Sequence, residues 1–350
     1  MATTSLTIGN ELLSTTMHIL MKDFRDNVYE SVAFLDAQER IHGSGKPVQS
    51  GGSRIVVPLG FGEHSSTTRL QTGFERIDLS VEDVFQPAQY DFGHVVRPVA
   101  ISSEEEMVNQ GDAAILSILE SRVMMTANAL KREYVKQIVA GGQAGWEDWN
   151  TLNGFDVTSG DHQGFLEENA VSAQGNTVGG VSKSTFSGKT GWQNQIFDGA
   201  GSFNSNGLAG LYDLKVEINA VSPSGAPNVI LASRAGFKNL KRALRAHERY
   251  VDQSKIDGGR MIETFDGVPI NVEYNMPNDG TATTADPISF YFLNMNDIYT
   301  LWDPQGYFDL SDFETVSGEY DVRAAKLRCR GQLIAKHLGS SGVAFDLDTF

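Results

Sequence analysis

The sequence predicts an α+β protein with an elongated, flattened shape. Three features support this prediction: an uninterrupted helical pattern over residues 112–140, a β-rich excursion at 51–92, and a helix–strand–helix unit at 207–250 followed by a β-rich tail. Globular helices average about 11–12 residues, so the first of these is unusually long. We therefore expect a helix that spans a whole domain and stiffens it, rather than one that lines a pocket.

The N-terminal residues 8–41 have a helical pattern that charged clusters interrupt. Apolar side chains recur there near helical spacing, but no compact partner lies nearby in the sequence. One interpretation is an amphipathic arm that packs on a neighbouring subunit. The alternative, of equal weight, is an ordinary helix of the chain's own domain.

A long β-hairpin is predicted next. A strand at 55–59 follows a polar, glycine-rich turn, and a second glycine-rich stretch leads to apolar alternation at 77–81. These strands have too few apolar side chains for a core of their own, and an isolated hairpin is marginal in water. The hairpin must therefore rest on something else. A further extended run at 94–101 ends in a serine–glutamate segment at 102–106, a helix start signal.

The long helix has clear predicted ends and one predicted buried stripe. Asp112 is the candidate N-cap and the glycines at 141–142 are the stop. The apolar side chains share an arc of about 100°, the width of one buried face. These residues are Leu116, Leu119, Val123, Ala127, Leu130, Tyr134 and Ile138. Residues 141–205 are rich in Gly, Asn, Ser and Gln, which predicts irregular loops with short strands, interpreted as a surface insertion.

The C-terminal half alternates helices and strands before it becomes β-rich. Helices are predicted at 207–221 and 235–250 around a short buried strand at 228–232. Further strands are predicted at 267–272, 288–293 and 298–302, and in a long final run through Val322, Leu327, Leu333 and Ala335.

Composition excludes several classes of protein. The formal net charge of −16 argues against tight coating of nucleic acid, which needs clustered cations. A single cysteine, Cys329, excludes an internal disulfide framework and a zinc site with several thiolates, and we expect it to be buried. The sequence has neither a secretory signal pattern nor a run of apolar residues long enough to span a membrane, so we expect a cytoplasmic product with no membrane contact.

No motif predicts catalysis, a cofactor or a metal. The segment 187–190 (SGKT) resembles the end of a phosphate-binding loop, but it lacks the required earlier glycine and a preceding strand. The histidines form no His-x-x-x-His pair. The acidic residues Asp309, Asp312 and Glu314 are interpreted as a solvated strand edge, with a structural cation site as the alternative.

Basic side chains share one face of the predicted helix at 235–250. They span an arc of about 100°, separate from the apolar face of that helix. We interpret them as a contact with an acidic surface on another copy of the chain, with weak nucleic-acid contact second and a solvated face as the alternative. The residues are Arg234, Lys238, Lys241, Arg242, Arg245 and Arg249.

The order of these elements resembles that of the major capsid proteins of tailed bacteriophages, the HK97-type capsid fold that encapsulin shells share. The segment 96–106 (VRPVAISSEEE) is similar to the family's return into its long spine helix. The stretch 227–244 (PNVILASRAGFKNLKRAL) resembles the strand and following helix of the axial domain. The segment 267–270 (GVPI), with Met-Pro at 276–277, resembles a run late in these chains.

The resemblance implies a division of the chain and a set of contacts. The parts are an N-terminal arm (1–45), an extended hairpin or E-loop (46–95), a peripheral domain with the spine helix (96–205), an axial domain (206–285) and a β-rich return (286–350). The hairpin would lie over an adjacent subunit, with Arg54, Arg69 and Arg76 as candidate salt-bridge donors.

The resemblance also implies a structural protein without catalytic residues. Such a subunit assembles as pentamers and hexamers into the icosahedral shell of a virion, around double-stranded DNA that it contacts only weakly. A separate scaffolding protein and a portal are implied as partners, and a decoration protein is a further candidate. Two other hypotheses stay open: a nanocompartment shell that encloses an enzyme, and a soluble enzyme or carbohydrate-binding protein with its site in residues 141–205.

Overall fold

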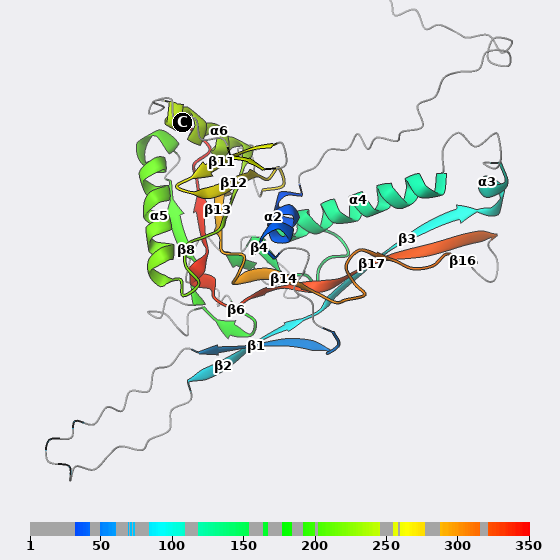
Figure 1. Cartoon of the computed structure of the whole chain (residues 1–350), viewed down its shortest axis with the longest axis horizontal. Coiled ribbons are helices and arrows are strands. Elements are labelled where there is room, and N and C mark those ends of the chain that lie inside the picture. The colour runs from blue at the N-terminus through cyan, green and yellow to red at the C-terminus, as the bar shows by residue number, and fades with distance from the viewer. Residues whose placement is uncertain are drawn as a thin grey trace, which may run out of the picture.

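Two β-sheets organise the protein, whose structure is a computed structural model (Figure 1). The structure describes residues 32–42, 50–60, 69, 71, 73, 84–108, 118–153, 164–166, 177–183, 192–199, 202–245, 255–257, 260–276, 288–315 and 321–350. Within these ranges, the side chains of residues 106, 108, 118–120, 245, 255–257 and 260–262 are not described.

The larger sheet has seven strands and mixed direction. Their order is β10 (Lys255–Asp257), β11 (Arg260–Phe265), β12 (Val268–Val272), β9 (Val229–Ala232), β13 (Ile288–Leu293), β18 (Gly342–Phe345) and β8 (Gln195–Asp198). The β12–β9 and β18–β8 pairs are parallel and the others antiparallel. The predicted strand at 288–293 is confirmed, and those at 228–232 and 267–272 are confirmed to within one residue.

The second sheet is built on the longest strand, β17 (Val322–Ala335). One edge of β17 pairs antiparallel with β3 (Gly93–Ser102), from Val322↔Ser102 to Gly331↔Gly93. β14 (Ile298–Trp302), β15 (Asp309–Leu310) and β16 (Glu314–Thr315) also pair with β17. Figure 1 shows β3 and β17 reaching away from the larger sheet as a ribbon beneath the long helix.

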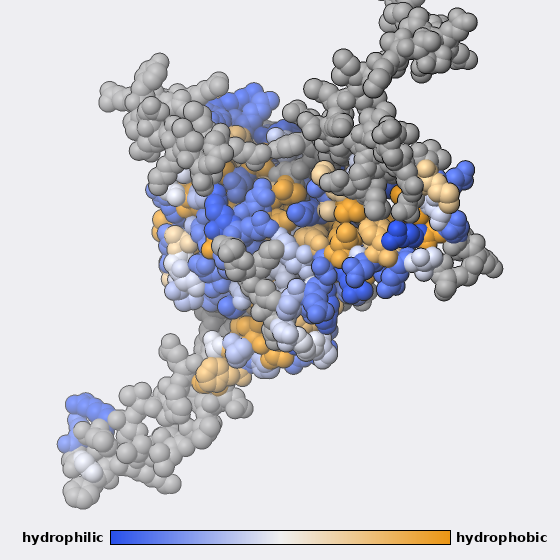
Figure 2. Space-filling model, turned by 45° about the vertical axis from the view of Figure 1, so that its right-hand side comes forward, coloured by the Kyte–Doolittle hydropathy of each residue, from blue (hydrophilic) through white to orange (hydrophobic). Residues whose placement is uncertain are grey.

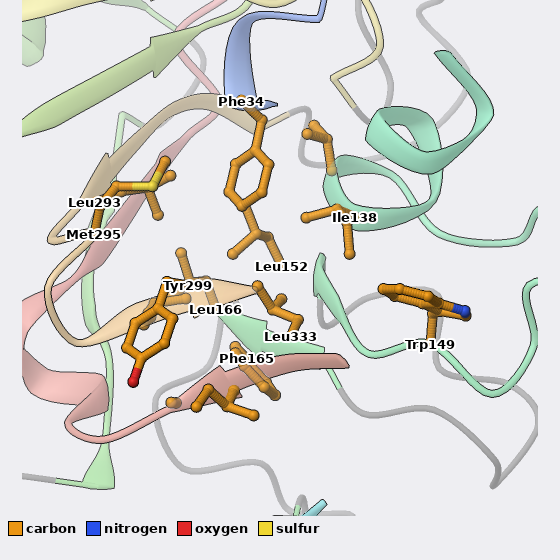
Figure 3. Packing of buried hydrophobic residues seen from close by; sticks show 14 of the residues in the cluster. Phe34, Ile138, Trp149, Leu152, Phe165, Leu166, Leu293, Met295, Tyr299 and Leu333 are labelled. Atoms are coloured by element: carbon orange, nitrogen blue, oxygen red, sulfur yellow. The ribbon is translucent and has the colours of Figure 1, made fainter. Parts of the chain in front are cut away.

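The larger sheet buries side chains on both faces. Neighbouring side chains of a strand point to opposite faces, so Ile230 and Phe290 pack under α5 (Leu208–Val221) and α6 (Arg234–Arg245). Leu231 and Tyr291 pack on the other face, with α2 (Ala33–His42), the end of the long helix and the second sheet. Figure 3 shows this second core, where Phe34 lies between strand and helix side chains.

The long helix, α4 (Ile118–Val139), confirms the prediction where it is described. Residues 112–117, with the candidate N-cap Asp112, lie outside the described part of the chain. The predicted stop is confirmed: Gly141 and Gly142 have φ of 81° and 72°, and the Gly141 N–H donates to the Gln137 carbonyl at 2.9 Å. This left-handed conformation suits glycine and ends a helix.

The predicted stripe of α4 is buried only in its C-terminal half. Leu130, Tyr134 and Ile138 are fully buried, whereas Val123 and Ala127 are half-buried. Leu116 and the side chain of Leu119 are not described. The difference has a physical reason: the N-terminal half of α4 extends past the core and lies over β3 (Figure 1).

The β3–α4 contact holds this extended half in place. The Arg97 guanidinium on β3 donates to both carboxylate oxygens of Glu133 on α4, at 2.6 Å each. At the far end, Arg122 of α4 reaches Glu105 of the short helix α3 (Ser103–Val108) at 2.7 Å. The predicted helix start near residue 102 is confirmed, because Ser102 and Glu105 form a reciprocal capping box. We call this end of the molecule, formed by α3, β3 and the first half of α4, the α4 arm.

The hairpin base consists of β1 (Arg54–Gly60) and β2 (Phe85–Asp91), paired antiparallel. The predicted strand at 55–59 is confirmed, while the alternation at 77–81 lies outside the described residues. The sequence prediction missed β2 because FQPAQYD contains a proline and few strand-favouring residues. The base rests on its own chain: the Tyr90 hydroxyl donates to the Ala335 carbonyl at 3.0 Å, and the Gln89 N–H donates to the Gly179 carbonyl at 2.9 Å.

The described parts of 141–205 contribute large side chains to the core. The predicted short strands are present as β4 (Thr151–Asn153), β5 (Gly164–Leu166), β6 (Thr177–Val178) and β7 (Val181–Ser182). The interpretation of this stretch as a surface insertion is wrong for these parts. Four aromatic side chains are at most 1% exposed, namely Trp146, Trp149, Phe165 and Trp192. A few large aromatic side chains outweigh the polar composition around them, since each buries a large apolar area.

Helix α2 also packs in the chain's own core. Phe34 is fully buried, and the Gln38 side chain donates to the Thr300 carbonyl at 2.9 Å. The buried carboxylate of Glu273 accepts a hydrogen bond from the N–H of Ala33 at the start of the helix, at 3.2 Å. For α2 the correct interpretation is therefore an ordinary helix of its own domain; residues 8–31 lie outside the described chain.

Candidate inter-subunit contact surfaces

The outer side of the hairpin base exposes apolar side chains. Strand alternation turns Ile55, Val57 and Leu59 inward and the other side outward. Val56 is 56% exposed and Phe85 is 75% exposed. Pro58 stands opposite Pro87 in the register, and both are exposed. We call the outward side chains of Val56, Pro58, Phe85 and Pro87 the hairpin face. An apolar patch of this kind on two short strands is suited to contact with another protein surface.

Arg54 lies at the edge of the hairpin face in an ion pair within its own chain. Its Nε donates to Asp91 Oδ1 at 2.6 Å and its Nη2 to Oδ2 at 3.1 Å, while Nη1 reaches the Gln89 side chain at 2.8 Å. This fork geometry suits guanidinium and carboxylate, and the hydrogen bond and charge of Asp91 raise the pKa of Arg54. Sequence reasoning missed Asp91 because the pairing depends on the hairpin register. Arg69 is exposed, and Arg76 lies outside the described residues.

The α6 cations separate into paired and outward side chains. At the start of α6, the Ser233 hydroxyl accepts a hydrogen bond from the Gly236 N–H at 3.0 Å. Lys241 forms an ion pair with Glu263 of β11. Lys238 and Arg242 are exposed one turn apart, and the Arg242 guanidinium lies 5.7 Å from the ring centre of Phe350. The side chain of Arg245 and all of Arg249 lie outside the described part of the chain.

Helix α5 exposes a face that the sequence prediction did not single out. Tyr212 is 43% exposed and Val216 is 64% exposed, and Asp213 and Glu217 beside them are exposed too. The cation of this helix, Lys215, is instead buried, and its Nζ lies 2.5 Å from Asp266 Oδ2. The spacing 212, 213, 216, 217 was the available signal, because these positions lie opposite the buried Leu211–Leu214–Ile218 face.

A third apolar surface lies on the α4 arm. Met124 and Met125 are each 47% exposed, Val96 of β3 is 42% exposed and Met107 of α3 is 68% exposed. Figure 2 shows hydrophobic residues gathered at this end of the molecule. Flexible methionine side chains suit contact surfaces that must adapt to a partner.

Potential metal ligands do not cluster in the described part of the chain. No group of three or more His, Cys, Asp or Glu residues there could hold a metal ion. Asp309, Asp312 and Glu314 are exposed, as expected for a solvated strand edge, and Cys329 is fully buried, which raises the pKa of its thiol. The segment 187–190 lies outside the described residues. Within the described residues, no helix is long and apolar enough to cross a membrane.

Comparisons with known proteins find similarity at the level of structure. No family model and no curated protein sequence matches the chain. The capsid of cyanophage A-1(L) matches with a TM-score of 0.64 at 16% identity, over 98% of this chain and 99% of the other. The capsid of the native GTA particle matches with a TM-score of 0.59 at 11% identity, over 95% of both chains.

An encapsulin is also similar over nearly the whole chain. The holo-SrpI encapsulin complex from Synechococcus elongatus matches with a TM-score of 0.57 at 11% identity, over 98% of this chain and 97% of the other. At these identities the likeness is one of fold. The chain therefore has the HK97-type capsid fold that its element order predicts.

Proposed function

We propose that this protein is the structural subunit of an icosahedral shell, the major capsid protein of a tailed bacteriophage. It would form pentamers and hexamers that enclose double-stranded DNA, act without catalytic residues and reside in the virion. The observation that carries the proposal is the end-to-end likeness to shell subunits, which covers 95% or more of both chains for the capsids of cyanophage A-1(L) and the GTA particle.

The exposed surfaces support the proposal independently. The hairpin face and the α4 arm leave Phe85 and Met107 more than two-thirds exposed. Large apolar side chains gathered on projecting elements indicate surfaces that partners cover. A shell subunit is covered by its neighbours on several sides, whereas an enzyme presents a concave site. In this proposal residues 46–95 lie over an adjacent subunit, and the axial part, 206–285, faces the capsomer centre.

The acidic chain fits a container for DNA. A net charge of −16 disfavours neutralising phosphates, so the packaged DNA would be contacted only weakly. A separate scaffolding protein, a portal and a decoration protein are the further partners that this function implies. A nanocompartment shell is the second candidate, because the SrpI encapsulin shares the fold over nearly the whole chain.

Electron microscopy of the purified protein tests the proposal. Rings or closed shells are expected, and a particle filled with DNA rather than protein separates the capsid from the nanocompartment. Persistent monomers under several salt conditions would overturn both. Deletion of residues 62–73 in the hairpin should leave the subunit folded but prevent shell formation, whereas deletion mutants that assemble normally would refute a hairpin contact between neighbours.

A further inference from the structure

We infer that α5 of one copy docks against α6 of the next copy in a capsomer ring, through opposite charges around an apolar centre. The inference rests on the proposed shell function. It names the partner of the α6 cations, namely the exposed face of α5 on a second copy of this chain.

The face that α5 offers is acidic and apolar. We call Tyr212, Asp213, Val216 and Glu217 the α5 face; all four are exposed on one side of the helix. Lys215 cannot neutralise these acids, because it is buried and bonded to Asp266. Among the described residues, Asp213 and Glu217 form no ion pair. Two carboxylates beside a Val216 that is 64% exposed therefore remain available to another chain.

The face that α6 offers is basic, with an aromatic ring beside it. α6 (Arg234–Arg245) contains no acidic residue. We call Lys238, Arg242 and Phe350 the α6 face; Phe350 is 49% exposed next to the Arg242 guanidinium. Lys238 and Arg242 form no ion pair within the described part of the chain. Phe350 gives Val216 of a neighbour an apolar partner between the charges.

The two faces do not meet within one subunit. Both helices turn their buried sides to the same core, through Leu214 of α5 and Leu240 of α6, so their exposed sides point away from it. In Figure 1, α5 runs along the left edge of the molecule and α6 along its top. Figure 2 shows hydrophilic residues at that top. Two complementary faces on different sides of one subunit make a head-to-tail contact, which closes into a ring when the rotation is right.

Reversing the charges of one face at a time, and then of both faces together, tests this contact. The first variant carries Asp213→Lys and Glu217→Lys, and the second carries Lys238→Glu and Arg242→Glu. Each alone opposes like charges, so its ring association constant at low salt should fall by at least about tenfold. A variant with all four substitutions restores opposite charges and should form rings again. All these side chains are exposed, and circular dichroism checks that each variant folds.

Mixing the two reversed variants gives a sharper result. Every contact between different variants has opposite charges, and every contact between like variants is repulsive. The mixture should therefore form rings with an even number of alternating subunits, such as hexamers, and not pentamers, by native mass spectrometry. The matched control, Asp312→Lys with Lys326→Glu, changes exposed charges on the β15–β17 side of the molecule and should leave ring formation unchanged.

The outcomes separate this contact from the proposed function. If the parent protein forms neither rings nor shells, the function itself is overturned. If the parent assembles and both reversed variants assemble equally well, the function stands and the α5–α6 contact is wrong. If the reversed variants fail alone and neither mixing nor the fourfold exchange restores rings, the two faces do not touch each other.

Discussion

The Tyr90 hydroxyl donates a hydrogen bond to the carbonyl oxygen of Ala335 across 3.0 Å, and so joins the hairpin base to the end of β17. Tyr90 is 2% exposed and lies beside Phe165, with ring centres 6.1 Å apart. If the hairpin lies over a neighbouring subunit as proposed, it must transmit force from that neighbour to the body of its own subunit. This buried bond and the packing around it fix the hairpin at its root.

Tyr90→Phe should lower the free energy of unfolding by about 1 kcal/mol, because it leaves the Ala335 carbonyl without its donor. Tyr291 provides the matched control: it is also fully buried, but its hydroxyl has no partner among the described residues. Tyr291→Phe should therefore be neutral or stabilising. Urea unfolding of unassembled subunits measures both. Equal losses in the two variants would show that the Tyr90 hydrogen bond adds nothing.

Gly210→Ala should destabilise the subunit although alanine favours a helix. Gly210 lies in α5, and a Cβ at this position would overlap the ring of Phe197 on β8. Helix propensity alone would favour alanine by about 1 kcal/mol, while overpacking costs about 1–3 kcal/mol. The melting temperature should fall, and Phe197→Leu in the same chain should recover part of the loss. The control Asn219→Ala, on the exposed side of α5, should not lower it. A rise in Gly210→Ala would contradict the close packing.

Local sequence signals predicted much of this fold. The Gly141–Gly142 stop was readable because a left-handed residue that ends a helix requires glycine or a close substitute. The strand at 288–293 was readable because both of its faces are buried, which leaves a continuous apolar run. The capsid fold itself was predicted because the order of these elements resembles that of a known family.

The sequence could not reveal what depends on register or on position in space. Arg54 has a candidate role from its charge, but its partner Asp91 follows only from the β1–β2 register. Val123 of α4 continues an apolar stripe, yet the helix passes the end of the core before that residue is buried. The exposed α5 face is hidden in the sequence for a related reason, because Tyr212 and Val216 resemble core residues until the helix is placed on its sheet.

His337 should make the subunit less stable in mildly acidic solution. Burial lowers the pKa of His337 from its usual 6.5, and the nearby Asp297 carboxylate opposes that effect only in part. The unfolded chain therefore binds a proton more readily than the folded one, so this contribution is present above pH 6.5 and is lost as the pH falls below it. Urea unfolding from about pH 7 to about pH 5 should show a weaker pH dependence in His337→Gln. Asp297→Asn removes the opposing charge and should strengthen the pH dependence of stability. If the free energy of unfolding changed equally with pH in all three proteins, His337 would be excluded as the cause.

Glu105 should make the stability of the subunit depend on pH in a separate and lower range. Hydrogen bonds from the Arg122 guanidinium and from the Ser102 N–H lower its pKa from 4.5 to about 2. Its stabilising contribution is therefore complete above pH 4.5 and is lost as the pH falls toward 2. Glu105→Gln keeps the capping geometry but removes the charge. This variant should melt below the parent at neutral pH, and the difference should shrink as the solution is acidified.

Arg122→Gln should lower the melting temperature in the same way. The double variant should lose less than the sum of the two single losses, because both changes remove the same interaction. Strictly additive losses would mean that α3 and α4 are held together by other contacts.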